Sequence, residues 1–144
     1  MSLISYQGLV GLVVTLALAV GCTPRRNTLR PYPDDVAAER ERKATALCRA
    51  RRAELPPNRF TTDGCSMWPD DSWVDCCVTH DMAYWCGGPS EARREADRAF
   101  CRCVSATMGS GWARVMFWGV RIGGPGWMPA PWRWGYGWPW LRDG

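Results

Sequence analysis

The chain contains a single histidine, His80, among 144 residues, and it has no Gly-x-Ser-x-Gly sequence. A serine hydrolase needs a histidine base beside a nucleophilic serine, which commonly stands in that sequence. The missing sequence and the lack of a second histidine therefore disfavour a serine hydrolase. Any histidine-dependent chemistry must use His80, which stands in the stretch DCCVTHDMAYWCGG at residues 75–88.

Charged side chains are absent from residues 1–21, so no Lys or Arg precedes the apolar run of 13 residues at 8–20. This run is too short for a spanning helix, which needs roughly 20 residues, but it suits the core of a signal peptide. The following LAVGC resembles the bacterial lipobox, whose cysteine is lipidated and becomes the new N-terminus. We therefore predict export to the bacterial cell envelope and a lipid anchor at Cys22. The alternatives are a plain secretory signal, giving a secreted protein, and a retained membrane helix.

An exported chain lies in an oxidising compartment, where thiols pair. After a signal peptide, roughly 120 residues remain, enough for one small domain. Residues 34–55 have the Ala, Glu and Arg content of a helix, and the Pro-Pro-Asn at 56–58 ends it. We divide the chain into a signal peptide at 1–21, a tether with an N-terminal helix at 22–60, a core at 61–124 and a Trp-rich tail at 125–144.

Net charge is unevenly distributed. Residues 23–60 carry +5, residues 61–110 carry −4 and residues 111–144 carry +3, which sum to the net charge of +4. An acidic segment between basic flanks suits a cation site beside an anionic lipid or cell-wall surface. The other interpretation is a solvated helix face with a chance distribution of charge. We expect a phospholipid membrane surface as the partner and no nucleic acid, and the sequence indicates no oligomeric state.

The stretch around His80 predicts a helix that follows Ser72 as N-cap, with Asp75 as its capping-box partner, and ends at Gly87 and Gly88. Residues three and four apart share a helix face. One stripe of this helix therefore contains Cys76, Cys77, His80, Asp81 and Tyr84. Such a composition is unlike an ordinary apolar core.

A second helix is predicted directly afterwards, with Ser90 as N-cap. Its packable stripe contains Ala92, Ala96, Ala99, Phe100, Cys103 and Val104. Because the link GGPS is short, the two helices are expected to be antiparallel neighbours. If Cys76 faces Cys103, then Ala83 faces Ala96 and Asp97 lies within reach of His80. The pattern predicts a His80–Asp97 pair and leaves Asp81 for another role.

The stretch CCVTHDMAY at residues 76–84 resembles the active-site helix of secreted phospholipases A2, whose pattern is Cys-Cys-x-x-His-Asp-x-Cys-Tyr. ADRAFCRC at 96–103 is similar to the second long helix of that family. TDGCS and the later PD, between Thr62 and Asp70, resemble the calcium-loop entry of its microbial branch. The resemblance covers about residues 61–105. It implies a mainly α fold in which disulfides link an antiparallel pair of long helices, with an N-terminal helix and a Trp/Gly/Pro-rich C-terminal tail.

The sequence departs from the family at two linked positions. The family cysteine three places after the histidine is Ala83 here, and its usual disulfide partner is Ala96. The helix pairing places these two positions face to face, so both ends of one bridge are missing together. The glycine-rich calcium loop of the animal enzymes is also missing, and the stretch from Asp63 to His80 is short even against microbial relatives.

Chemistry follows from these residue types. His80 is the candidate general base for a water molecule, because an unperturbed imidazole titrates near ~6.5. Asp97 would hold the other ring nitrogen and stabilise the imidazolium as it forms. Asp81 would bind a calcium ion. The resemblance adds the other site residues: Asp63 and the Gly64 carbonyl as calcium ligands, and Tyr84 as hydrogen-bond support for the aspartate.

Eight cysteines less a lipidated Cys22 leave seven, an odd number. The resemblance implies two disulfides, Cys65–Cys77 and Cys76–Cys103. One further bridge and one free thiol then come from Cys48, Cys86 and Cys101, with Cys48–Cys86 and Cys48–Cys101 both open. Two alternatives to the His–Asp site also stand: a zinc site using Cys76, Cys77, His80 and Cys86, and a structural histidine on a disulfide-linked helix.

The C-terminal third predicts one more helix, WARVMFWGVRIGG, ended by Gly123 and Gly124. The tail WMPAPWRWGYGWPWLRDG is too rich in Gly and Pro for a regular helix. Its tryptophans suit either a rim at a membrane interface or a collar packed over the helix pair.

Together, these patterns predict calcium-dependent hydrolysis of the sn-2 acyl ester of glycerophospholipids by a lipid-anchored enzyme. The alternatives are a phospholipase A2-like lipid-binding module that has lost turnover and a structural lipoprotein of the envelope. Headgroup and acyl-chain preference do not follow from the sequence.

Overall fold

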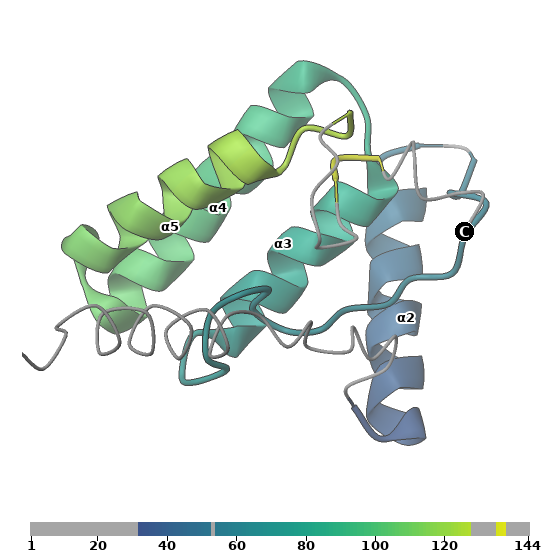
Figure 1. The fold of residues 1–144 in the computed structure, drawn as a ribbon. Coiled ribbons are helices and arrows are strands. Elements are labelled where there is room, and N and C mark those ends of the chain that lie inside the picture. Colours follow the sequence, from purple (N-terminus) through teal and green to yellow (C-terminus); the bar gives the residue numbers. More distant parts are fainter. Residues whose placement is uncertain (1–31, 53, 128–134, 138–144) are drawn as a thin grey trace, which may run out of the picture.

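The computed structural model describes residues 32–52, 54–127 and 135–137. These residues form four α-helices and no β-strand: α2 at Asp34–Arg49, α3 at Val74–Cys86, α4 at Ser90–Met108 and α5 at Ser110–Gly123 (Figure 1). The mainly α class is therefore confirmed. None of the helices in the described ranges is long and apolar enough to cross a membrane. The predicted signal peptide, Cys22 and most of the Trp-rich tail lie outside the described residues.

Helix boundaries differ from the predicted ones at four places, one of which is the start of α5 at Ser110 rather than Trp112. α2 ends at Arg49 rather than near Leu55. Ser72 is not the N-cap of α3, because Trp73 takes that position and the amides of Val74 and Cys76 bond the carbonyls of Asp71 and Trp73. This backbone turn satisfies amide groups that a serine cap would otherwise bond. Likewise, α4 begins one residue early, since Pro89 is its N-cap and Ser90 is its first helical residue.

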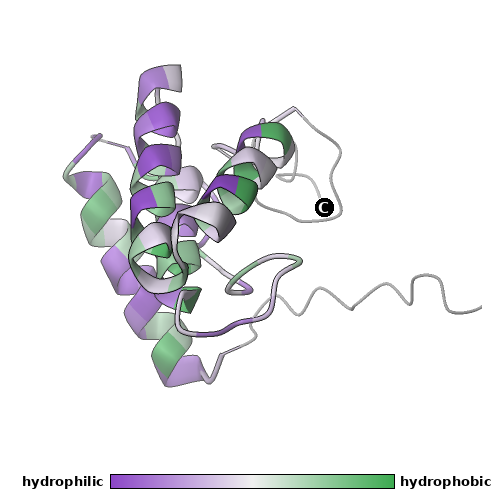
Figure 2. Ribbon diagram, turned by 90° about the vertical axis from the view of Figure 1, so that its left-hand side faces the viewer, coloured by the Kyte–Doolittle hydropathy of each residue, from purple (hydrophilic) through white to green (hydrophobic). Residues whose placement is uncertain are grey.

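The helices pack in chain order, so that α3 lies between α2 and α4, and α5 lies along α4 (Figure 1). α3 and α4 are antiparallel, because Cys76 near the start of α3 is bonded to Cys103 late in α4, whereas Tyr84 near the end of α3 contacts Arg93 early in α4. In Figure 2, hydrophobic and hydrophilic residues alternate along the helices. α3 is the central element, with ten of its 13 residues buried.

Three disulfides fix this arrangement: Cys48–Cys86 joins α2 to α3, Cys65–Cys77 joins the preceding loop to α3, and Cys76–Cys103 joins α3 to α4. The last two are the pairs that the family resemblance implies, and the first settles the open pairing of Cys48. Cys101 keeps a free thiol. Disulfides are typical of proteins in an oxidising, extracellular environment, which agrees with the predicted export.

The stripe predicted on α4 is correct for Ala96, Phe100 and Val104, which are buried at i, i+4 and i+8. Ala99 and Cys103, which were predicted on the same stripe, are exposed, because they lie beside this row. Asp97 joins the buried set and is fully inaccessible. A charged side chain in this position needs partners, and they come from α3 and α5.

The described part of the tail lies over the end of α3. The Tyr136 amide bonds the Gly124 carbonyl at 2.9 Å, and the Gly137 amide bonds the Tyr84 carbonyl at 2.8 Å. The ring of Tyr136 packs edge-on against that of Tyr84, with centroids 5.2 Å apart. This segment therefore covers the ring of Tyr84. Of the tail's tryptophans, only Trp127 is among the described residues.

Candidate functional site

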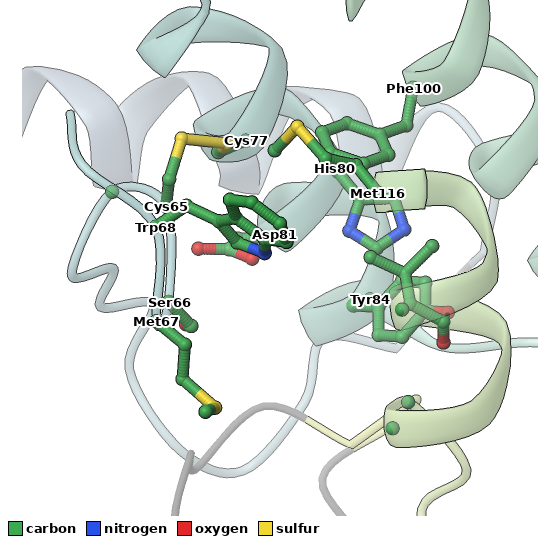
Figure 3. A pocket seen from close by; sticks show the side chains of 15 residues that line it. Cys65, Ser66, Met67, Trp68, Cys77, His80, Asp81, Tyr84, Phe100 and Met116 are labelled. Carbon is green, nitrogen blue, oxygen red and sulfur yellow. Dashed lines mark hydrogen bonds between the residues drawn. A yellow bond between two sulfur atoms is a disulfide. The ribbon is translucent and has the colours of Figure 1, made fainter. Parts of the chain in front are cut away.

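A cavity of about 320 Å³ lies between α3, α5 and the loop before α3. Figure 3 shows His80 and Asp81 at its centre, with Met67 and Trp68 on the loop side and Met116 on the α5 side. Most of the lining is apolar, and the polar groups come mainly from α3. An apolar pocket with a few convergent polar groups is the usual form of a small-molecule site.

His80 and Asp97 form a buried pair across α3 and α4. His80 Nε2 lies 2.9 Å from Asp97 Oδ1, and neither residue is more than 7% exposed. An ionised carboxylate can only accept a hydrogen bond, so Nε2 carries the hydrogen and Nδ1 keeps its lone pair. Among the described residues, no side chain or backbone group bonds Nδ1. Burial lowers the pKa of His80, and Asp97 offsets part of this effect. The ring is therefore held neutral and able to accept a proton at Nδ1.

Asp97 receives two further hydrogen bonds. The Tyr84 hydroxyl donates to Oδ1 at 2.7 Å, and Arg121 Nη1 on α5 donates to Oδ2 at 2.7 Å. Burial raises the pKa of Asp97, but the hydrogen bonds from His80, Arg121 and Tyr84 outweigh it, so that the pKa lies below its ordinary value. The carboxylate stays ionised and can balance a positive charge on the imidazole.

Two arginines that the sequence did not single out complete this network. Arg121 forms the ion pair with Asp97, and Arg93 donates from Nε to the Tyr84 hydroxyl at 3.1 Å. Nη2 of Arg93 also donates to the carbonyls of Val120 and Arg121, at 3.2 and 2.9 Å. These carbonyls are in the last turn of α5, and that of Val120 also accepts the Gly124 amide at 3.0 Å. The signal in the sequence that could have indicated Arg121 is that it is the lone cation in the last turn of an otherwise apolar stretch, GVRIGG.

Asp81 is a carboxylate 7% exposed, one residue from His80. Its hydrogen bond in the structure comes from the Thr62 hydroxyl, which donates to Oδ2 at 2.6 Å. Burial raises its pKa well above the ordinary value, and the charges of Asp63 and Asp70 raise it further. No ion pair to Asp81 forms within the described part of the chain. A buried carboxylate with two acidic neighbours and no cation is costly, and a bound cation would relieve that cost.

The loop before α3 supplies the other candidate calcium ligands. Gly64 lines the cavity together with Asp81, whereas Asp63 accepts a hydrogen bond from the Ser66 hydroxyl at 2.8 Å and does not line it. Gly64 has φ +81, and a Cβ there would lie 2.4 Å from the carboxylate oxygens of Asp70. Only glycine therefore fits this turn, which Asp70 closes by accepting from the Cys65 amide at 2.8 Å.

These oxygen donors fit calcium better than zinc. Calcium takes carboxylates, carbonyls and water at flexible geometry. The zinc alternative fails, because Cys76, Cys77 and Cys86 are all in disulfides and cannot serve as thiolate ligands. No group of three or more His, Cys, Asp or Glu side chains is placed to hold a metal among residues 32–52, 54–127 and 135–137. A calcium ion would therefore depend on Asp81, on backbone carbonyls and on water or substrate oxygens.

His80, Asp81, Tyr84 and Gly64 thus line one cavity, and Asp97 supports it by its hydrogen bonds to His80 and Tyr84. Asp63 is not among the lining residues. A comparison of the chain with protein-family models, with curated proteins and with solved structures found no match.

Proposed function

We propose that the protein hydrolyses the sn-2 acyl ester of glycerophospholipids with the aid of calcium, in the manner of a phospholipase A2. The observation that carries this proposal is the His80–Asp97 bond at 2.9 Å, which leaves Nδ1 beside a mostly apolar cavity. A base at the wall of an apolar cavity suits a substrate that is largely hydrocarbon around one reactive ester.

In the proposed reaction, Nδ1 of His80 takes a proton from a water molecule as the water oxygen attacks the ester carbonyl carbon. Asp97, held ionised by Arg121 and Tyr84, balances the charge of the imidazolium. The bond from the carbonyl carbon to the glycerol oxygen then breaks, and the imidazolium returns its proton to that oxygen. The products are a fatty acid and a lysophospholipid, and the histidine regains its starting form.

Asp81, with the Gly64 carbonyl and Asp63, is the candidate calcium-binding group. Bound calcium would supply positive charge that polarises the ester carbonyl and stabilises the oxyanion. Thr62 supports this arrangement, because its hydroxyl donates to Asp81 and accepts from the Gly64 amide at 3.1 Å.

A second candidate is a lipid-binding module of the same type without turnover. The lack of three clustered acidic ligands within the described residues favours it, since weak calcium binding would leave Asp81 without its cation. Both candidates keep the apolar cavity, and they differ only in whether the ester is cleaved.

The test is fatty-acid release from mixed phospholipid vesicles in the presence of calcium. His80→Gln is expected to lower the rate roughly 10²–10⁴-fold, the usual contribution of general acid–base catalysis. Thr79→Ala is the matched control, because Thr79 is the exposed neighbour of His80 on α3. If His80→Gln retains activity within about threefold of wild type, His80 is not the base. If the wild type releases no fatty acid, the binding module is the better proposal.

A further inference from the structure

Large apolar side chains are exposed in only one part of the described structure. The six that are 49–75% exposed are Met67, Trp112, Val115, Trp118, Ile122 and Trp127. Four belong to α5, Trp127 follows α5 closely, and Met67 is in the loop before α3. None of the six lies on α2, α3 or α4. We call the side chains of Met67, Trp112, Val115, Trp118 and Ile122 the α5 surface.

The α5 surface borders the cavity that contains His80. Trp112, Val115, Trp118 and Ile122 follow one another at three or four residues and so form one helical stripe. Gly119, next to Trp118 in the sequence, lines the cavity. On the other side, Met67 both lines the cavity and is 75% exposed. The ring of Trp68, which also lines the cavity, contacts that of Trp112 edge-on at 5.6 Å between centroids.

Charge on α5 has one sign only. The helix contains Arg114 and Arg121 and no acidic residue. Arg121 is engaged by Asp97, whereas Arg114 is exposed and lies one turn before Trp118. Tryptophan beside aliphatic side chains and a cation suits the boundary between the headgroups and the acyl chains of a bilayer, where the ring is in an apolar layer and the N–H stays hydrated.

We propose that the α5 surface binds directly to an anionic phospholipid bilayer, with Trp118 and Ile122 inserted at the interface and Arg114 at the headgroups. The bilayer then meets the mouth of the cavity, which Met67 and Trp68 line. That a lipid ester passes from the bilayer into the cavity rests on the proposed function, whereas membrane binding by α5 does not.

The test measures binding to vesicles of diether phosphatidylglycerol and diether phosphatidylcholine, which have no acyl ester to cleave. Every protein in this test is the exported full chain with the substitution Cys22→Ser, so that no lipid anchor contributes to binding. The double variant Trp118→Ser/Ile122→Ser is expected to lower vesicle partitioning on the order of tenfold or more. Trp118→Phe/Ile122→Leu, which keeps the apolar area, is the matched control and should retain binding. Because both positions are exposed, the fold should persist, as unchanged thermal unfolding will show; Trp118→Ser alone is the fallback variant.

Charge provides a second arm of the test. Arg114→Gln should weaken binding to the anionic vesicles about fivefold and leave binding to purely zwitterionic vesicles unchanged. Arg49→Gln, which makes the same charge change at an exposed position of α2, should have no such effect. Equal binding by Arg114→Gln and Arg49→Gln would contradict the role of Arg114.

Three outcomes overturn the proposal. The first is vesicle binding by the Trp118→Ser/Ile122→Ser variant that equals wild type, and the second is no binding by wild type at all. The third is a wild-type dimer in sedimentation equilibrium that this variant converts to a monomer, which would make the α5 surface an interface between two copies. Hydrolysis of a dispersed short-chain phospholipid, measured in parallel, separates the two proposals: its absence refutes the proposed function and leaves the vesicle result standing.

Discussion

The burial of Asp81 makes a quantitative prediction about calcium and stability. In chelator, the folded state holds this carboxyl in an apolar cavity wall with Asp63 and Asp70 nearby, and its pKa lies well above the ordinary value. Because the pKa of Asp81 is raised in the folded state, the stability that its protonated form contributes is fully present at a pH below its pKa in the unfolded chain, about 3.9. Stability is then lost as pH rises through the folded pKa. At neutral pH without calcium, Asp81→Asn should therefore unfold at a higher temperature than wild type.

Calcium should reverse this order. Extracellular calcium modules with few protein ligands have dissociation constants on the order of 10⁻⁴–10⁻³ M. At about 10⁻² M calcium, binding to the folded state alone would stabilise wild type by about 1.4–2.7 kcal/mol, or roughly 6–20 °C for a domain of this size. Asp81→Asn should show no such response.

Thermal unfolding by circular dichroism, with chelator and with calcium, measures both effects. Asp75→Asn is the matched control, since it makes the same change at a side chain 90% exposed on the same helix. It should behave like wild type. A wild type whose melting temperature and hydrolysis do not change at about 10⁻² M calcium would refute the assignment of Asp81 as a calcium ligand, and the binding module would become the better account.

Three further predictions concern Arg121, the anchor and the scaffold. Arg121→Met removes a charge-assisted hydrogen bond from buried Asp97, so it should cost about 1.5–3 kcal/mol of stability in thermal unfolding. In steady-state assays this variant should lower kcat with little change in KM. Arg121→Lys should recover part of the stability and part of kcat. Detergent phase separation should move Cys22→Ser to the aqueous phase, since the lipid anchor is lost; retention in the detergent phase would contradict anchoring at Cys22. Replacing both Cys76 and Cys103 by Ser should lower the free energy of unfolding by about 3–4 kcal/mol in denaturant titrations, and an unchanged midpoint would refute a stabilising role for this bridge.

Local periodicity explains what could be predicted at the site. The stripe on α3 and the short link to α4 were enough to place Asp97 near His80, because antiparallel neighbours fix the register once Cys76 faces Cys103. Arg121 could not be predicted in the same way. Its ion pair spans 24 residues and depends on how α5 lies along α4, which no local pattern encodes.

Other parts of the fold depended on tertiary geometry as well. The choice between Cys86 and Cys101 as the partner of Cys48 required the position of α2 against α3. Ser72 had the right residue type for a cap, but the backbone turn before Val74 already satisfied the amides. For membrane contact, the sequence analysis considered the tryptophans of the tail. The exposed apolar row that the structure describes is on α5. This row could not be predicted, because periodicity alone does not show which face of an isolated helix the core covers.

The most direct test of the central claim is the identity of the fatty acid released from phospholipids that carry different acyl chains at sn-1 and sn-2. Mass spectrometry of the products, with calcium present, should show the sn-2 chain from wild type and a rate at least roughly 10²-fold lower from His80→Gln. Release of the sn-1 chain, or equal release by wild type and His80→Gln, would contradict the account.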